Sequence, residues 1–328
     1  MSELVDTLRG RIRGLVRFQP QPGVTYPESL ILDDPLRARG RVVALGLGGA
    51  LLGLVSYFAF APAVISVVTW LGWVLAGSPG ELVGYYQAAM RFEQPVGMLA
   101  TNLGLSVLIP ISFALVLFVH RFSPRVLHSV QPGFRWRFGF VALLIGFVVL
   151  TGVWLLSRIG QPLVFAPEPQ VLAFLVIIVV TSPLQAAAEE YFFRGYLIQA
   201  LHTTAPASPL FGVVSSAAVF AVMHGTQNLP LFLYRFVFGI LAGWLVLKTG
   251  GLEAGIAAHV VNNVVAYGYA ALSGGVAALH AVSQIGWADL AWSLFGFAAF
   301  TAVAIWLGAR MKLATVTPGV RFGGVGEV

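Results

Sequence analysis

Residues 171–190, VLAFLVIIVVTSPLQAAAEE, decide the fold class of this chain. Residues 171–188 contain no charged side chain, and a run of that length is about what one helix needs to cross a bilayer. The run ends in two adjacent carboxylates, Glu189 and Glu190. Ionisable groups in an apolar helix are costly, so each is a candidate functional group. The stretch therefore predicts a membrane helix that contains candidate functional side chains.

Similar apolar runs fill most of the chain. Only 10% of the 328 residues are charged and 58% are hydrophobic, whereas soluble domains carry about 25% charged residues. A surface that faces lipid needs no charge, which explains the deficit. The sequence predicts an all-α, polytopic membrane protein of about eight transmembrane helices. The other seven runs are residues 42–76, 96–119, 138–156, 209–223, 231–247, 254–272 and 287–307.

The basic residues orient the predicted helices. They concentrate before residue 42, in residues 121–137, at Lys248 and after residue 309. All four segments fall on one side if residues 42–76 form a single span, tilted or kinked at Pro62. The positive-inside rule then predicts a multi-pass protein of the cell membrane with both termini in the cytoplasm. The net charge of +6 thus reflects topology and contact with the lipid bilayer, and it indicates no nucleic-acid partner.

This pattern divides the chain into three regions. Residues 1–41 form a basic cytoplasmic segment, with a predicted amphipathic helix at residues 3–18, a Pro-rich linker after it and no cleaved signal peptide. Residues 42–308 form the transmembrane domain. Residues 309–328 form a cytoplasmic tail, which is Gly-rich and predicted to be disordered after Leu313.

The adjacent glutamates lie on different faces of their helix. Glu190 and Arg194 are four residues apart, so they share a face and can pair, whereas Glu189 is rotated by about 100°. One carboxylate is then neutralised, while Glu189 can point into a cavity and act as a base near neutral pH. The alternative is a cytoplasmic helix end with solvated charges.

Two later apolar runs also carry polar groups. His224 closes one of them, and His259 and Asn263, four residues apart, project from one face of another. Together with Glu189 they supply a carboxylate base, imidazoles and donors for an oxyanion, which are the groups that a hydrolase needs. The alternatives are an interfacial histidine and hydrogen bonds between helices.

Two further features bear on the chemistry. The chain contains no cysteine, which excludes disulfides, a thiol nucleophile, Cys metal ligands and a prenylation box of its own. Arg235 lies about one turn inside an apolar run, and we interpret it as a side chain that snorkels to the interface. Pairing with a cavity group is the alternative.

The three motifs, in this order, resemble those of the CAAX-protease and bacteriocin-processing (CPBP, or Abi) family of glutamate-type intramembrane proteases. That family includes the eukaryotic Ras-converting CAAX endopeptidase. The resemblance covers a CPBP-like core at residues 171–272, about a third of the chain. The residues that match are Glu189-Glu190-x-x-x-Arg194, Phe220-x-x-x-His224 and His259-x-x-x-Asn263.

The resemblance implies a helical membrane fold with an inward-opening cavity. It also implies hydrolysis of a peptide bond in a membrane-associated peptide or protein substrate. In that mechanism Glu189, with His224, activates a water molecule, and His259 and Asn263 stabilise the tetrahedral oxyanion.

Glu190 and Arg194 match the remaining motif positions, and we expect them to have a structural, orienting role. No cofactor is expected. Glu189, His224 and His259 could in principle hold zinc, since two His and one Glu are a known ligand set. The resemblance implies the metal-free mechanism, which is the interpretation we favour.

Two functions of other classes compete with the protease. The first is a non-catalytic membrane protein of the same fold, such as an immunity factor, scaffold or chaperone. The second is a transporter with Glu189 as a proton-coupling carboxylate, but we find no duplicated halves of the kind that many transporters show. The sequence leaves open the substrate, its prenylation and the oligomeric state.

Overall fold

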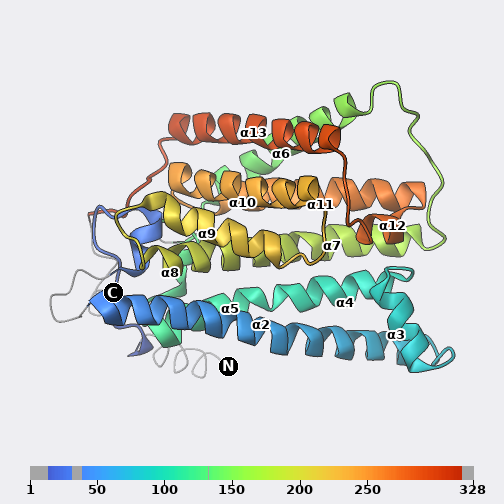
Figure 1. Cartoon of the computed structure of the whole chain (residues 1–328), viewed down its shortest axis with the longest axis horizontal. Helices are drawn as coiled ribbons and strands as arrows, with labels where there is room; N and C mark the ends of the chain where they lie inside the picture. Colours follow the sequence, from blue (N-terminus) through green and yellow to red (C-terminus); the bar gives the residue numbers. More distant parts are fainter. Residues whose placement is uncertain (1–13, 32–38, 132, 320–328) are drawn as a thin grey trace.

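The computed structural model describes residues 14–31, 39–131 and 133–319. These residues form a bundle of helices that run roughly along one axis, and they contain no β-strand (Figure 1). The main helices are α2 (Arg39–Leu75), α3 (Leu82–Met90), α4 (Pro95–Ser106), α5 (Leu108–Ala114), α6 (Trp136–Ser157), α7 (Val171–Glu189), α8 (Ile198–His202), α9 (Pro209–Val222), α10 (Leu229–Thr249), α11 (Glu253–Ser273), α12 (Val276–His280) and α13 (Trp287–Arg310). Shorter turns complete the order, namely the 3-10 turns η1 (Tyr26–Leu30) and η3 (Pro124–Leu127) and the π-helical turns η2 (Leu115–His120) and η4 (Glu190–Leu197).

The all-α polytopic class is confirmed, but the count of eight spans is not. Within the described residues, six helical segments are long and apolar enough to cross a membrane. They are Arg39–Leu75, Pro95–His120, Trp136–Ser157, Val171–His202, Leu229–Thr249 and Trp287–Arg310. The other two predicted spans coincide with α9 and α11. Helix α9 has only 14 residues, and α11 interrupts its apolar stretch with a histidine and two asparagines.

The first predicted span is one helix, as its charge pattern indicated. Helix α2 runs for 37 residues through Pro62 without a break. Its outer face exposes large apolar side chains such as Leu51 and Phe58, which suit contact with lipid. Its inner face buries small residues, including Gly49 and Gly53, so that the helix lies close to the rest of the bundle.

The central helices bring the three motifs together. Helix α7 packs between α4 and α11, while α9 and α10 pack against each other and against the η4 turn that continues α7. The first motif lies at the junction of α7 and η4, the second at the end of α9, and the third in the middle of α11. Side chains from three separate helices therefore meet inside the bundle.

The described terminal segments pack against each other, which corrects the predicted disorder for residues 314–319. The predicted linker includes the turn η1, whose Tyr26 is buried and donates a hydrogen bond to the carbonyl of Leu127 at 2.6 Å. The tail predicted to be disordered is paired at Thr317, which exchanges backbone hydrogen bonds with Val24 and Gly23 at 2.9 and 3.0 Å. The amphipathic helix predicted at residues 3–18 falls largely outside the described residues, as do residues 320–328.

Candidate active site

Glu189 lies in the interior of the bundle, at the last residue of α7. Its side chain belongs to a 32-residue apolar segment, Val171–His202, and only 7% of the residue is exposed. Directly after it the helix widens into the π-helical turn η4. Such turns are rare within α-helices and often occur at functional sites. The solvated helix end, which was the alternative for this motif, is not what the structure contains.

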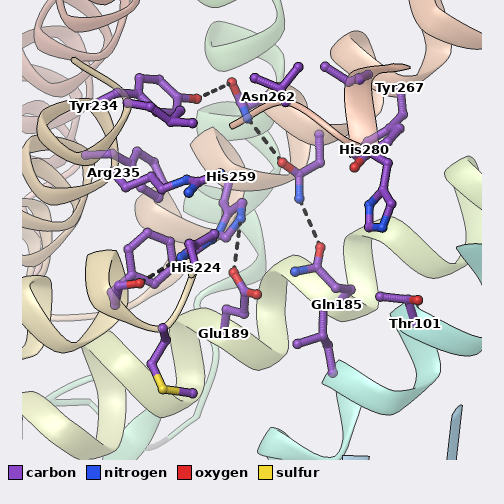
Figure 2. A pocket seen from close by; sticks show the side chains of 18 of the residues that line it. Thr101, Gln185, Glu189, His224, Tyr234, Arg235, His259, Asn262, Tyr267 and His280 are labelled. Carbon is purple, nitrogen blue, oxygen red and sulfur yellow. Dashed lines mark hydrogen bonds and ion pairs between the residues drawn. The ribbon is translucent and has the colours of Figure 1, made fainter. Parts of the chain in front are cut away.

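His259 lies between the two adjacent carboxylates. Its Nε2 is 3.5 Å from Oε2 of Glu189 (Figure 2), and its Nδ1 is 3.0 Å from Oε1 of Glu190. A carboxylate only accepts hydrogen bonds, so the contact with Glu190 places a proton on Nδ1. Glu190 thereby fixes the orientation of the imidazole and directs Nε2 toward Glu189.

The predicted pair between Glu190 and Arg194 is present and fully buried. Nη1 of Arg194 lies 3.0 Å from Oε1 of Glu190, and neither side chain is more than 1% exposed. The contact lacks the alignment of a hydrogen bond, so its attraction is mainly that of two opposite charges. The guanidinium also lies over the rings of Phe220 and Phe238, with distances of 4.1 and 5.0 Å from Cζ to the ring centroids. This pair neutralises one of the two carboxylates, as the helix-face argument predicted.

His224 lies in the turn just after α9. Its Nδ1 is 2.7 Å from the backbone oxygen of Phe220, and a carbonyl can only accept, so Nδ1 carries the proton. In the neutral ring Nε2 is then free to accept a proton or to hold a water molecule. His224 and Glu189 line the same cavity, and within the described residues no hydrogen bond joins them.

Asn263 belongs to a chain of polar side chains that the sequence analysis missed. Its Nδ2 donates to Oε1 of Gln185 at 2.9 Å, and its Oδ1 accepts from Asn262 at 3.1 Å. Tyr234 extends the chain, since its hydroxyl donates to Oδ1 of Asn262 at 3.3 Å (Figure 2). Gln185 precedes Glu189 by four residues, so the helical spacing that paired other residues would have identified it.

All four predicted catalytic residues line one cavity of about 550 Å³, a usual size for a ligand site. The structure thus brings Glu189, His224, His259 and Asn263 together, while their catalytic roles stay predictions. Arg235 also lines this cavity, and its Nη1 donates to Oε1 of Gln227 at 2.6 Å. The interpretation of Arg235 as a snorkelling side chain is therefore wrong, because α10 turns it inward.

The cavity does not present a ready-made zinc site. Among the residues that the structure describes, no cluster of three or more His, Asp or Glu side chains has the arrangement to hold a metal ion. Nδ1 of His259 is already hydrogen-bonded to Glu190, and Nδ1 of His224 is hydrogen-bonded to the carbonyl of Phe220. The expectation that no cofactor is needed stays a prediction.

Comparison with known proteins agrees with the family resemblance of the motifs. Residues 170–265 match the family model described as "Type II CAAX prenyl endopeptidase Rce1-like". The chain is also similar to "Uncharacterized protein YyaK" of Bacillus subtilis (strain 168). The two are 25% identical over 225 residues, which are 62% of this chain and 73% of the relative. No solved structure matches the chain significantly.

The matched segment contains all the residues of the three motifs. It runs from the start of α7 into α11. The family match supports the function of a membrane endopeptidase at the level of the family. Residues 170–265 are therefore similar to the Rce1-like family, which is consistent with the CPBP family that the motifs predict.

Proposed function

We propose that this chain is an intramembrane endopeptidase that hydrolyses a peptide bond in a membrane-associated peptide or protein. The observation that carries the proposal is a buried carboxylate, Glu189, 3.5 Å from His259 in the wall of a cavity, within the segment that is similar to the Rce1-like family. A base in such a place can act on water that the bilayer otherwise excludes.

In the proposed reaction, Glu189 and the free Nε2 of His224 hold a water molecule. Glu189 accepts a proton from it while the hydroxide oxygen bonds to the peptide carbonyl carbon. The carbonyl electron pair moves onto oxygen, and the oxyanion is stabilised by Nδ2 of Asn263 and by Nε2–H of protonated His259. Glu189 then gives its proton to the leaving nitrogen as the C–N bond breaks, which yields a carboxylic acid and an amine.

Glu190 and Arg194 support this chemistry without contacting the substrate. Glu190 holds Nδ1 of His259 and so fixes the orientation of the imidazole that donates from Nε2 in the proposed reaction. Arg194 balances the charge of Glu190, which leaves Glu189 as the carboxylate available to the cavity.

Substitution of Glu189 tests the proposal. We expect Glu189→Gln, which keeps the size of the side chain but removes the base, to lower peptide hydrolysis by a factor of about 10²–10⁴. The measurement compares membrane and exported proteins of a deletion strain carrying the wild-type or the variant chain, with uncleaved precursors identified by mass spectrometry. Leu184→Ala, at an exposed position of the same helix, is the matched control. Normal processing by the Glu189→Gln chain would contradict the proposal and favour a non-catalytic role.

We further propose that the chain lies in the cell membrane with both termini in the cytoplasm. The start of α2, the segment joining η2 to α6 and the end of α13 lie at the same end of the bundle (Figure 1). These places carry Arg39, Arg121, Arg135 and Arg310. The positive-inside rule assigns that end to the cytoplasm. Reporter enzymes that are active on only one side of the membrane, fused after Gly319, test this orientation.

A further inference from the structure

Arg235 is a cation held inside the cavity by a neutral partner. It lies near the start of α10 and is half-buried, and its Nη1 donates to Oε1 of Gln227 at 2.6 Å. Gln227 is fixed in turn, because its Nε2 donates to the carbonyl of Ala221 at 2.6 Å. The amide therefore positions the guanidinium without compensating its charge.

Two arginines with little-exposed side chains, Arg135 and Arg194, have carboxylate partners, and Arg235 does not. Arg135 lies 2.6 Å from Glu253, and Arg194 lies 3.0 Å from Glu190. In the part of the chain that the structure describes, Arg235 forms no ion pair. A half-buried guanidinium that forms no direct ion pair attracts anions more strongly than one in open water.

Two carboxylates, Glu189 and Asp289, line the cavity with Arg235, and among the described residues neither forms an ion pair with it. Oδ2 of Asp289 accepts the backbone N–H of Gly286 at 3.0 Å, at the beginning of α13. The N–H groups of Arg235 other than the one bonded to Gln227 have no partner among the described residues, and the cavity is the space beside them. A ligand rather than a protein side chain is thus expected to complete this site.

The position of the cation relates it to the reacting groups. Gln227 follows His224 by three residues in the turn between α9 and α10, and Tyr234, the neighbour of Arg235, belongs to the polar chain of Asn263. Figure 2 shows Arg235 and Tyr234 on the same side of the cavity, above His224. Short segments of chain and hydrogen bonds therefore connect a group bound at Arg235 to the proposed water and oxyanion sites.

We propose that Arg235, positioned by Gln227, forms a binding subsite for a carboxylate of the substrate. The planar guanidinium can bind both oxygens of a carboxylate, which fixes the orientation as well as the position of the ligand. The inference rests on the proposed function in that the carboxylate would belong to the peptide that is hydrolysed. Its source is either the C-terminal carboxylate of the peptide or an acidic side chain near the scissile bond.

Binding of three short apolar peptides tests the subsite without requiring hydrolysis. The probes are N-acetyl-trileucine as the free acid, the same peptide as its C-terminal amide, and N-acetyl-Leu-Glu-Leu amide. Their affinities are measured with the full-length protein in lipid nanodiscs. We expect the wild type to bind at least one of the two carboxylate peptides about tenfold or more tightly than the neutral amide. The preferred probe identifies the source of the carboxylate.

Variants assign the preference to Arg235. We expect Arg235→Gln to remove the preference while its affinity for the neutral amide stays within about twofold of that of the wild type. Arg310→Gln, which removes the same charge at an exposed position outside the cavity, should keep it. Equal affinity of the wild type for all three peptides, no binding of either carboxylate peptide, or an undiminished preference in Arg235→Gln would each overturn the subsite. Cleavage by the wild type is scored separately, so a preference without cleavage contradicts only the proposed function.

Discussion

Two neighbouring glutamates have different environments because they project from different sides of one helix. Glu190 meets Arg194 and His259, and its carboxyl group is completely buried. Glu189 lies in the cavity wall, with His259 as its one ion-pair partner among the described residues. The sequence alone was sufficient to predict that the two glutamates face different sides, since that prediction needs only the helical repeat and the position of Arg194.

Gln185 is expected to position Asn263 for its proposed role. Replacing it with Leu removes the acceptor of the 2.9 Å hydrogen bond and frees the amide of Asn263 to rotate. A misplacement of about 1 Å in a catalytic group can lower the rate by about a hundredfold. We expect Gln185→Leu to lower kcat by about ten- to a hundredfold with little change in KM, measured on any peptide that the wild type cleaves.

The control for this prediction is thermal unfolding of the same variant. An unchanged unfolding temperature with a lowered kcat identifies a positioning role, whereas a fall in both would point to a general packing defect. An unchanged kcat would show that the amide of Asn263 needs no partner on α7.

The sequence pointed to the ionisable and imidazole groups of the cavity and missed most of its neutral polar groups. Glu189, His224 and His259 stand out because charge and imidazole are rare in apolar helices. Gln185, Asn262 and Tyr234 do not, because amides and phenols also serve ordinary hydrogen bonds between membrane helices. For Arg235 the sequence permitted both an outward and an inward side chain, and only the packing of α10 decides between them.

At the scale of elements, the glycines of α2 determine how closely it approaches the site-bearing helix. A Cβ atom at Gly49 would lie 2.0 Å from the hydroxyl oxygen of Tyr196, and one at Gly53 would lie 2.8 Å from the ring of Phe192. Both aromatic residues belong to η4, which follows Glu189 directly. The small residues therefore let α2 support the widened turn next to the candidate base.

Gly49→Ala is expected to destabilise the bundle. The added methyl group overlaps the hydroxyl of Tyr196, which also bonds to Nε2 of His120 at 3.0 Å, and overpacking of this kind costs about 1–3 kcal/mol. Thermal unfolding in detergent should therefore occur several degrees lower. Gly48→Ala is the matched control, because a Cβ atom there meets nothing within 4 Å. Equal unfolding temperatures for the two variants would refute this account of the helix contact.

Helix boundaries were predictable where apolar length alone defines them. The 37-residue α2 follows from its unbroken hydrophobic run and from the charges that flank it. The π-helical η4 was not predictable, because its sequence is also compatible with an ordinary α-helix and the widening depends on the packing of buried Arg194 and Tyr196. The assignment of α9 and α11 as spans needs more than hydropathy, since one is short and the other polar.

At the scale of the whole molecule, the two ends of the described chain form one structure. Thr317 is 3% exposed and exchanges hydrogen bonds with residues 21–24, and Thr25 pairs with Val316. The sequence predicted a linker and a disordered tail here, because Pro and Gly are frequent in both segments. Contacts between residues almost 300 positions apart leave no local pattern, so they could not be predicted from composition.

Truncation distinguishes a structural tail from a dispensable one. We expect a chain that ends at Leu313 to unfold several degrees below the full-length protein, because it loses the hydrogen bonds of Thr317 to Val24 and Gly23. A chain that ends at Gly319 keeps these bonds and serves as the control. Unfolding is followed by tryptophan fluorescence on heating, and identical curves for the two truncated proteins would show that the pairing contributes nothing.

The pairing of residues 21–25 with residues 316–317 also imposes an order on biosynthesis. The first segment of the pair leaves the ribosome early, whereas its partner is translated only after the last helix of the bundle. At about 5–20 residues per second, the intervening residues take on the order of 15–60 s to make. During that interval the early segment lacks this partner, although it can already contact the region around Leu127 and helix α8 once these are made. Closure of the two ends is thus a late event in the maturation of this protein, and it follows the insertion of every helix that carries the candidate site.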